Sequence, residues 1–391
     1  MLPTRPNLRP NCMLSWMILV VTFCTLAHIF NFFAPVTTPA SQTGRPPPRS
    51  RQRKESAPTP IQPVTSKVRP SDSQNILVIF TGRWAYLRIN FAYIYRSLRK
   101  NGGILDQVHY IMVQYNNRTL SKLTRLADSA NKHLGQEVFR FRYRNPNKDT
   151  RARPKGIFAE ITYEIFNEMA KYPKRKYLKL DDDIVYVHPG AFEQLLQQQN
   201  TTECFVHFGN IGGANWRSSF IHQEMGIYNN PAINPKKLKF GFDKGGHPKC
   251  GWKSAECAEL ALRAFLFHHG NKSLEKYLFG GRYLTQERAR YSINFLLMDV
   301  NIIDLKAMME TGPIGNDDEA WLTVKYSRKV KNPNCVVGHA FVVHFSYFTT
   351  EAAIKKRDFL KKFETIAYED LVKFLPQEFQ TILAFNTTNK A

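Results

Sequence analysis

Three consecutive aspartates, Asp181, Asp182 and Asp183, lie between the strand-like segments "KYLKL" and "IVYV". Successive side chains of an extended chain point to opposite faces, so Asp181 and Asp183 are expected to converge and Asp182 to point away. Two converging carboxylates repel unless a cation lies between them, and Mg²⁺ and Mn²⁺ are hard cations that bind carboxylate oxygen. The triplet therefore predicts a divalent metal site. A solvated turn or a helix-capping cluster is the alternative.

Segments before the triplet alternate between strand and helix patterns. The expected strands are 75–80, 108–115, 137–143 and 176–187, and the helices between them are 89–103, 119–135 and 156–172. This order is typical of an α/β domain with a mostly parallel sheet flanked by helices. Ligands of such sheets bind at the carboxyl ends of the strands, so Thr81, Gly82 and Arg83 are expected at one edge with the triplet.

Beyond residue 213 the pattern loosens and then becomes largely helical. Helices are expected at 255–269, 292–310, 315–329 and 351–375, and a final strand at 338–348. The helix at 315–329 begins with the acidic run "GNDDEAW", and acidic residues stabilise a helix N-terminus. Capping is thus one explanation of these charges.

The N-terminal 73 residues read as a membrane-anchoring segment. Residues 13–34 contain an uncharged apolar run long enough to span a bilayer, whereas a cleaved signal peptide with "TPA" as its cleavage site is the alternative. Residues 1–12 would form a cytoplasmic tail, 35–73 a Pro-rich stem, and 74–391 a lumenal domain. The basic residues after the span oppose this orientation. Sequons at Asn117, Asn200, Asn271 and Asn386 favour it.

Charge and cysteine content bound the partners. Lys and Arg number 55 against 32 Asp and Glu, a formal net charge of +23, which suits polyanions or phosphate-bearing ligands. No nucleic acid is expected as a partner, because the chain has a predicted span and no recognised nucleic-acid module. Cys204, Cys250, Cys257 and Cys335 permit two disulfides in three connectivities. Four buried thiols and a zinc site are the alternatives.

The stretch "YLKLDDDIVYVHPGAF" resembles the D-x-D motif of GT-A glycosyltransferases, and is most similar to that of Golgi families with a full aspartate triplet. The resemblance implies a GT-A-like fold, with a nucleotide-binding half at 74–200 and an acceptor-binding half at 201–391. It also implies a type II protein of the Golgi (or ER) membrane. The implied activity is metal-dependent transfer of a sugar from a nucleotide sugar to a hydroxyl of a glycan, glycoprotein or glycolipid.

The resemblance assigns roles to the triplet and to later residues. Asp181 and Asp183 would hold Mn²⁺ (or Mg²⁺), and Asp181 and Asp182 would contact the donor, Asp182 at its sugar or ribose. His344 matches a C-terminal metal ligand, although a structural histidine is the alternative and His339 is a second candidate.

An acidic residue at the start of a late helix is the catalytic base of inverting members. Asp318, or second Asp317, would fill that place here, while the family's usual Glu-Asp pair is absent.

Cationic side chains are needed near a departing diphosphate, where negative charge develops. Arg83, Arg153 and Lys155 are placed to line the sheet edge with Thr81, although each cation is also explained as a surface charge. Two other functions remain open: a lumenal glycoside hydrolase that uses a carboxylate pair, and a catalytically inactive glycan-binding protein.

Overall fold

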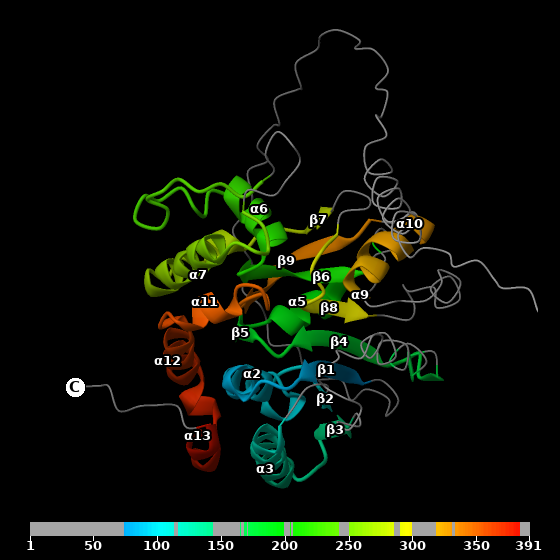
Figure 1. Cartoon of the computed structure of the whole chain (residues 1–391). Helices are drawn as coiled ribbons and strands as arrows, with labels where there is room; N and C mark the ends of the chain where they lie inside the picture. Colours follow the sequence, from blue (N-terminus) through cyan, green and yellow to red (C-terminus); the bar gives the residue numbers. More distant parts are fainter. Residues whose placement is uncertain are drawn as a thin grey trace, which may run out of the picture. The chain divides into compact units, whose positions relative to one another are not determined.

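The structure is a computed structural model, and its described elements lie within the unit Lys67–Ala391 (Figure 1). It describes residues 74–112, 116–143, 165, 168–169, 171–198, 204, 206–241, 250–284, 290–298, 318–330 and 333–383. The predicted tail, anchor and stem (1–12, 13–34 and 35–73) lie outside these ranges. Within them, no helix combines the length and the apolar character that a membrane crossing requires.

A large sheet lies at the centre of the described domain (Figure 1). Its strands are β1 (Asn75–Thr81), β2 (Gln107–Met112), β3 (Phe139–Tyr143), β4 (Lys176–Asp181), β5 (Ile184–Val187), β6 (His207–Gly213), β7 (Arg282–Leu284), β8 (Phe295–Met298) and β9 (Cys335–His344). Their order is β3-β2-β1-β4-β8-β6-β9-β5, and β7 pairs with β9. The inner strands are apolar along nearly their whole length because both faces of the sheet are covered, as the burial of β1 shows.

Helices pack around this sheet. They are α2 (Trp84–Arg96), α3 (Asn117–Leu134), α5 (Ala191–Gln197), α6 (Trp216–Glu224), α7 (Ala255–Gly270), α9 (Asp318–Ala320), α10 (Ser327–Val330), α11 (Glu351–Lys355), α12 (Phe359–Leu371) and α13 (Gln377–Leu383). A π-helical turn, η4 (Trp321–Tyr326), joins α9 to α10, and short 3₁₀ turns lie at η1 (Arg99–Asn101), η3 (Leu274–Tyr277) and η5 (Val372–Phe374). Helix α2 packs on β5 and α12, and α7 packs on β6.

The sheet is mixed, which corrects the prediction of a mostly parallel one. The block β3-β2-β1-β4 is parallel, as the alternation of strands and helices before the triplet predicted. Strand β8 then inserts antiparallel between β4 and β6, and β5 and β7 are antiparallel to β9. The α/β class with flanking helices is confirmed, and the direction of the later strands is not.

The prediction of a helix over 292–310 is wrong in its described part. Phe295–Met298 forms β8, and all four of these residues are buried. A short apolar run does not distinguish a buried strand from a buried helix by its periodicity, and here pairing with β4 and β6 decides for the strand. Helix α2 also ends at Arg96, before the glycines at which a stop was expected.

A buried polar pair fastens the irregular junction of β6 and β9. The register of these strands shifts at Asn210, whose Nδ2 donates to the carbonyls of Tyr277 (2.7 Å) and Gly338 (3.0 Å). The Nε2 of His222 lies 2.7 Å from Asn210 Oδ1. Burial lowers the pKa of His222 to about 3, so the ring is neutral and its Nε2–H donates to Asn210.

This histidine predicts an acid-sensitive fold. The pKa of a histidine exposed to water is about 6.5, and that of His222 in the folded protein is about 3, so between these values the unfolded chain binds the additional proton. The free energy of unfolding should therefore fall as the pH falls below 6.5, by up to about 1.4 kcal/mol per pH unit from this group. His222→Gln keeps an N–H donor for Asn210 without titrating. Its melting temperature should depend less on pH between about 6.5 and 5 than that of the wild type, and equal slopes would contradict the assignment.

Candidate functional site

The aspartate triplet lies in a turn between two strands. Strand β4 ends at Asp181, Asp182 and Asp183 form the turn, and β5 begins at Ile184. The prediction that one extended segment runs through the triplet is therefore wrong. The reason is the sheet order: β4 pairs with β1 and β8, whereas β5 pairs with β9 at the other end of the sheet, so the chain must leave one strand to enter the other.

Asp182 fixes the turn to the end of β1. Its Oδ2 accepts the backbone N–H groups of Gly82 (3.2 Å) and Arg83 (3.1 Å), and its Oδ1 accepts from Arg83 Nε (3.0 Å) and Nη2. Asn90 Nδ2 donates to its backbone carbonyl at 3.0 Å. These contacts confirm that residues 81–83 lie at the same sheet edge as the triplet. They also show that Asp182, expected to point away, is the most firmly held of the three carboxylates.

Asp183 lies between the side chains of Arg83 and His344. Its Oδ2 is 2.9 Å from Arg83 Nη2 and 3.3 Å from His344 Nε2, and its side chain is only 5% exposed. The backbone carbonyl of Asp183 accepts from Phe345 N, which joins the turn to the end of β9. The structure thus brings together Arg83, Asp183 and His344, three of the residues that the sequence had proposed.

His344 is oriented by a backbone carbonyl. Its Nδ1 lies 2.9 Å from the carbonyl oxygen of Ala214, so Nδ1 carries a proton and donates it. Nε2 is then the atom directed at Asp183. Histidines that bind metals are commonly held in this way, with the second ring nitrogen bound to a carbonyl or carboxylate. Burial favours the neutral ring, but the charge of Asp183 prevails and raises the pKa of His344 above its ordinary value.

The two buried carboxyls respond differently to the same surroundings. Burial raises the pKa of Asp182 to about 6 against the attraction of Arg83, which leaves the carboxyl ionised at neutral pH. Burial also acts on Asp183, but His344 and then Arg83 overcome it and hold the pKa of Asp183 below its usual range. Both groups are therefore ionised carboxylates at neutral pH, and all four of their oxygens can accept hydrogen bonds.

Asp181 lies at the same edge but has its own partners. Lys179 Nζ pairs with its Oδ1, and Asn294 Nδ2 donates to its Oδ2 at 2.6 Å. Lys179 also donates to the carbonyl of Ile293 at 2.8 Å. The side chain of Asp181 is 24% exposed, against 6% and 5% for Asp182 and Asp183, so it is the carboxylate of the triplet that faces solvent.

Arg83 reaches a third carboxylate. Its Nη1 is 3.7 Å from Glu351 Oε2 at the start of α11, and its guanidinium lies 4.9 Å from the ring centre of Tyr86. Glu351 accepts from Tyr86 Oη at 2.7 Å and pairs with Lys355 Nζ at 2.7 Å. The side chain of Arg83 is 37% exposed. Arg83 therefore has the two buried carboxylates on one side and, on the other, both solvent and Glu351.

The remaining predicted site residues are only partly described. Thr81 is buried at the end of β1, and its Oγ1 has no hydrogen-bond partner in the described part of the chain. Asp318 is the first described residue of α9, and Glu319 Oε1 pairs with Arg290 Nε at 2.5 Å. Asp317, Arg153 and Lys155 lie outside the described residues. The alternative histidine, His339, is exposed on β9.

The donor set suits a hard divalent cation in part. Asp183 and His344 supply carboxylate oxygen and an oriented imidazole nitrogen, which Mn²⁺ accepts. Asp181 is turned to Lys179 and Asn294, and no group of three acidic, His or Cys side chains in the described ranges is arranged to hold a metal. Two protein ligands fit a cation that takes its other ligands from substrate phosphates and water.

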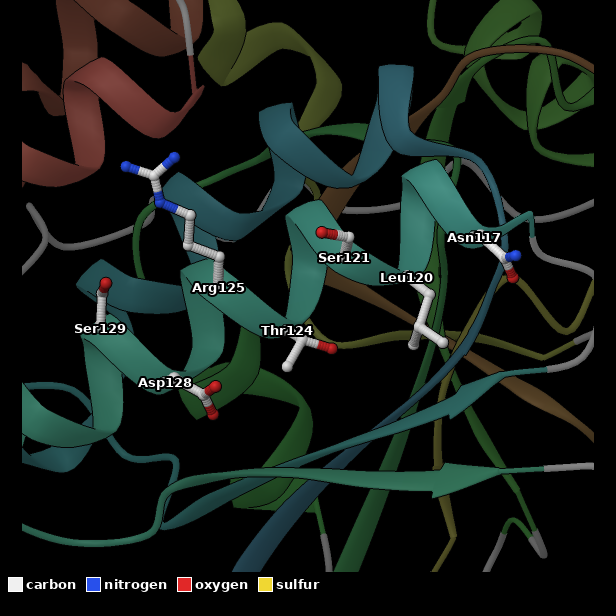
Figure 2. A pocket seen from close by; sticks show the side chains of 7 residues that line it. All are labelled: Asn117, Leu120, Ser121, Thr124, Arg125, Asp128 and Ser129. Carbon is white, nitrogen blue, oxygen red and sulfur yellow. The ribbon is translucent and has the colours of Figure 1, made fainter.

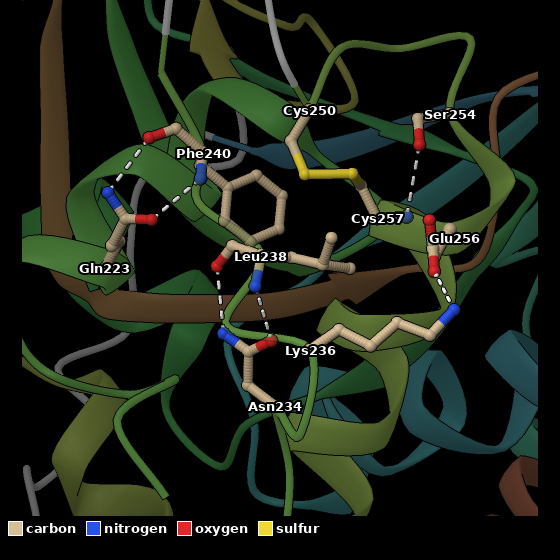
Figure 3. Close-up of a disulfide and its surroundings, with 9 residues drawn as sticks. All are labelled: Gln223, Asn234, Lys236, Leu238, Phe240, Cys250, Ser254, Glu256 and Cys257. Atoms are coloured by element: carbon tan, nitrogen blue, oxygen red, sulfur yellow. Dashed lines mark hydrogen bonds and ion pairs between the residues drawn. A yellow bond between two sulfur atoms is a disulfide. The ribbon is translucent and has the colours of Figure 1, made fainter. Parts of the chain in front are cut away.

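Two other features of the domain lie apart from the triplet. A hollow along α3 is lined, among described residues, by one face of that helix (Figure 2): Asn117, Leu120, Ser121, Thr124, Arg125, Asp128 and Ser129. None of the predicted site residues is among the described residues that line it. Disulfides join Cys204 to Cys335 and Cys250 to Cys257, which confirms two disulfides and excludes zinc at the latter pair (Figure 3).

Several contacts of the site had no signal in the sequence. Asn294 and Lys179 position Asp181, Asn90 and Asp182 hold the turn, and Glu351 provides the third carboxylate partner of Arg83. Asn294 lies in the segment that was predicted as a helix. Its contact with Asp181 is apparent only from the pairing of β8 with β4.

Comparisons with known proteins give a weak structural likeness and no match in sequence. No protein-family model and no curated protein sequence matches the chain. Among solved structures it is similar to the crystal structure of GalNAc-T7 with UDP, GalNAc and Mn²⁺, with a TM-score of 0.37 and 12% sequence identity. The match covers 80% of this chain and 54% of that one, so this chain spans about half the length of that protein.

The contacts of the triplet predict that replacing its members lowers the free energy of unfolding by different amounts. Asp182→Asn removes the charge that neutralises Arg83 inside the turn, so its free energy of unfolding should be roughly 3–5 kcal/mol lower than that of the wild type. Asp181→Asn, at a partly exposed carboxylate, should cost less than half as much. Chemical denaturation of the two variants measures both values. A smaller loss for Asp182→Asn than for Asp181→Asn would contradict the role of Asp182 as the anchor.

Proposed function

We propose that this protein is a metal-dependent glycosyltransferase that moves a sugar from a nucleotide-sugar donor to a hydroxyl of a glycan, glycoprotein or glycolipid. The observation that carries the proposal is the pair of buried carboxylates, Asp182 and Asp183, at the carboxyl end of a parallel strand pair. Arg83 and the oriented His344 lie against them. Ligands of open α/β sheets bind at this edge. The resemblance of the triplet to the D-x-D motif gives the reaction.

Asp183 and His344 are the proposed protein ligands of Mn²⁺ (or Mg²⁺), with Asp181 as a third from the more exposed end of β4. When bound, the cation would neutralise the diphosphate of the donor and of the leaving group. Asp182 is proposed to position these ligands and not to bind the cation, because its oxygens accept hydrogen bonds from the backbone of residues 82–83 and from the Arg83 side chain. A contact of Asp182 with sugar or ribose would require an oxygen to leave one of these partners.

Arg83 is the proposed cationic partner of the diphosphate. Its side chain is partly exposed, and it carries more hydrogen-bond donors than the two aspartates use. Thr81 offers a buried hydroxyl at the same edge. Arg153 and Lys155 are retained as further candidates from the sequence.

Asp318, with Asp317 as the second candidate, is proposed to accept the proton of the attacking hydroxyl. Helix α9 begins at Asp318. The helix is tied to the sheet region through Thr323, whose Oγ1 donates to Glu319 O at 2.7 Å and whose carbonyl accepts from Asn334 Nδ2 at 3.0 Å. Glu319 is occupied by Arg290, which leaves its two acidic neighbours as the better candidates for a base.

A Golgi (or ER) membrane location with a lumenal domain remains part of the proposal. Two disulfides support it, because disulfides persist in oxidising compartments. Asn117 and Asn271, the two described sequon positions, are both exposed, as glycosylation would require. The type II anchor at 13–34 is proposed from the sequence.

The proposed reaction predicts loss of turnover in Asp183→Asn. The exchange keeps the side chain's size but removes the charge that faces Arg83 and His344. Transfer should fall by more than about 100-fold, since even outer partners of a metal ligand are worth 10–100-fold. Full-length protein is supplied with Mn²⁺ and a panel of nucleotide sugars, and released nucleoside diphosphate is measured with and without acceptor. The exposed, ion-paired Asp358→Asn is the control, and full activity of folded Asp183→Asn in metal-stripped buffer would refute the mechanism.

Arg83 predicts two binding changes of opposite sign. Without it, a cation no longer competes with Mn²⁺ for Asp183, but the diphosphate loses a partner. Arg83→Gln should therefore bind Mn²⁺ alone roughly tenfold more tightly, and UDP or GDP with Mn²⁺ roughly tenfold more weakly. Electron paramagnetic resonance measures the first affinity and calorimetry the second.

Arg88→Gln is the matched control for this test, since Arg88 lies on α2 and pairs with Glu364 of α12, which is outside the proposed site. Arg83→Lys keeps the charge and should show smaller changes in the same directions. If the affinities of Arg83→Gln for Mn²⁺ and for the nucleoside diphosphate change in the same direction, Arg83 does not interact with both the aspartates and the donor.

A further inference from the structure

Two aromatic side chains form an exposed pair close to the proposed active site. Phe348 is 62% exposed, and its ring centre lies 5.7 Å from that of the half-buried Trp252, with the ring planes inclined by 45°. We propose that Trp252 and Phe348, called here the aromatic pair, bind a pyranose ring of the acceptor. This inference rests on the proposed function and adds the part of the site that receives the sugar.

The aromatic pair is held in place by backbone contacts. Thr349 Oγ1 donates to the carbonyl oxygen of Trp252 at 2.8 Å, which fastens the segment after β9 to the segment before α7. Lys253 Nζ lies 5.0 Å from the ring centre of Trp252. The two aromatic residues come from segments nearly a hundred positions apart, and the Thr349 contact fixes their separation.

A disulfide stiffens the Trp252 side of the pair (Figure 3). Cys250 is bonded to Cys257 in the first turn of α7, so the residues between them form a short closed loop. Within it Ser254 caps the helix by accepting Cys257 N at 3.3 Å. A loop that is closed by a covalent bond and a helix cap loses little entropy when a ligand binds, which favours a preformed binding surface.

Tyr347 links the aromatic pair to the carboxylate site. Tyr347, the neighbour of Phe348, has its ring 5.2 Å from that of His344. A small hollow is lined by Ala214 and Tyr347 on the side of His344 and by Gly251 and Cys257 on the side of the disulfide. Phe348 follows His344 by four residues, so its backbone lies within about 14 Å of it. One or two sugar rings span such a distance.

The chemistry of the aromatic pair favours a sugar ring over a protein as its ligand. Aromatic rings have a negative face, and the C–H groups on the apolar face of a pyranose carry partial positive charge and pack against it. A protein partner would need roughly 800 Å² of surface per side, far more than two rings provide. Thr349 and Lys253 add a hydroxyl and an ammonium beside the rings, which suits a ligand whose edges carry hydroxyl groups.

Sugar binding tests the pair directly. Full-length protein without donor is titrated with methyl β-D-galactopyranoside, lactose and chitobiose while tryptophan fluorescence is recorded. Phe348→Ala should weaken binding of at least one sugar roughly tenfold, and Trp252→Ala should abolish the fluorescence change. Phe374→Ala is the matched control, because Phe374 is an exposed ring with Lys373 Nζ 5.1 Å from its centre. It should bind as the wild type does.

A second measurement separates this inference from the proposed function. With donor and Mn²⁺, Phe348→Ala should raise the acceptor KM roughly tenfold and leave transfer to water and the affinity for nucleoside diphosphate unchanged. An unchanged acceptor KM, or no binding of any of the three sugars by the wild type, overturns the aromatic pair as the acceptor site. A wild-type protein that binds sugar through this pair but neither binds nor hydrolyses any nucleotide sugar supports the pair and overturns the glycosyltransferase.

Discussion

The neutralisation of two adjacent buried carboxylates is the constraint on which the rest of the site depends. The side chains of Asp182 and Asp183 are only 6% and 5% exposed, and both are ionised at neutral pH. Buried charges of one sign are tolerated only if cations and hydrogen-bond donors surround them. Arg83 contacts both, two backbone N–H groups bind Asp182, and His344 faces Asp183. The end of β1, the turn after β4 and the end of β9 are thereby fixed to one another.

The directions of the strands bring these three segments to one edge of the sheet. Strand β8 is antiparallel to both β4 and β6, and β9 is parallel to β6, so β9 runs in the direction of β1 and β4 and ends at their edge. Here β8 runs antiparallel between β4 and β6, which brings Asn294 to Asp181. Strand β9 pairs antiparallel with β5, and in that register Ile184 lies opposite His344. Ile184, the residue directly after the triplet, is therefore paired with His344, whose side chain contacts Asp183.

Local patterns were sufficient to predict the parallel half of the domain and part of the site. The apolar strands that end at Thr81 and Asp181 are separated by helices, which implies parallel neighbours with their ends at one edge. His344 was a candidate through the resemblance, which implies a C-terminal histidine ligand, and the structure places it at the end of β9. Local pattern could not predict that the chain turns within the triplet, because strand pairing with β9 decides this. It pointed to Asp181 and Asp183 as the converging pair, whereas Arg83 joins Asp182 and Asp183.

The contacts beyond these strands are long-range and had no local signal. Glu351 lies far from Arg83 in sequence, and Asn294 lies far from Asp181. The four cysteines suggested two disulfides, but their pairing depends on β9 and on the first turn of α7. A four-residue apolar run such as Phe295–Met298 fits a helix as well as a strand until its neighbours are known.

The position of Arg83 also explains how an acidic motif functions in so basic a chain. The carboxylates of Asp182 and Asp183 are buried beneath the guanidinium, while part of Arg83 faces solvent and Glu351. An approaching ligand therefore meets a cation first and the aspartates second. An arginine suits this place better than a lysine, because its planar fork of donors can bind two carboxylates and retain N–H groups for a phosphate. With a formal net charge of +23 on the chain, the surroundings favour an anionic ligand at an edge whose buried floor is acidic.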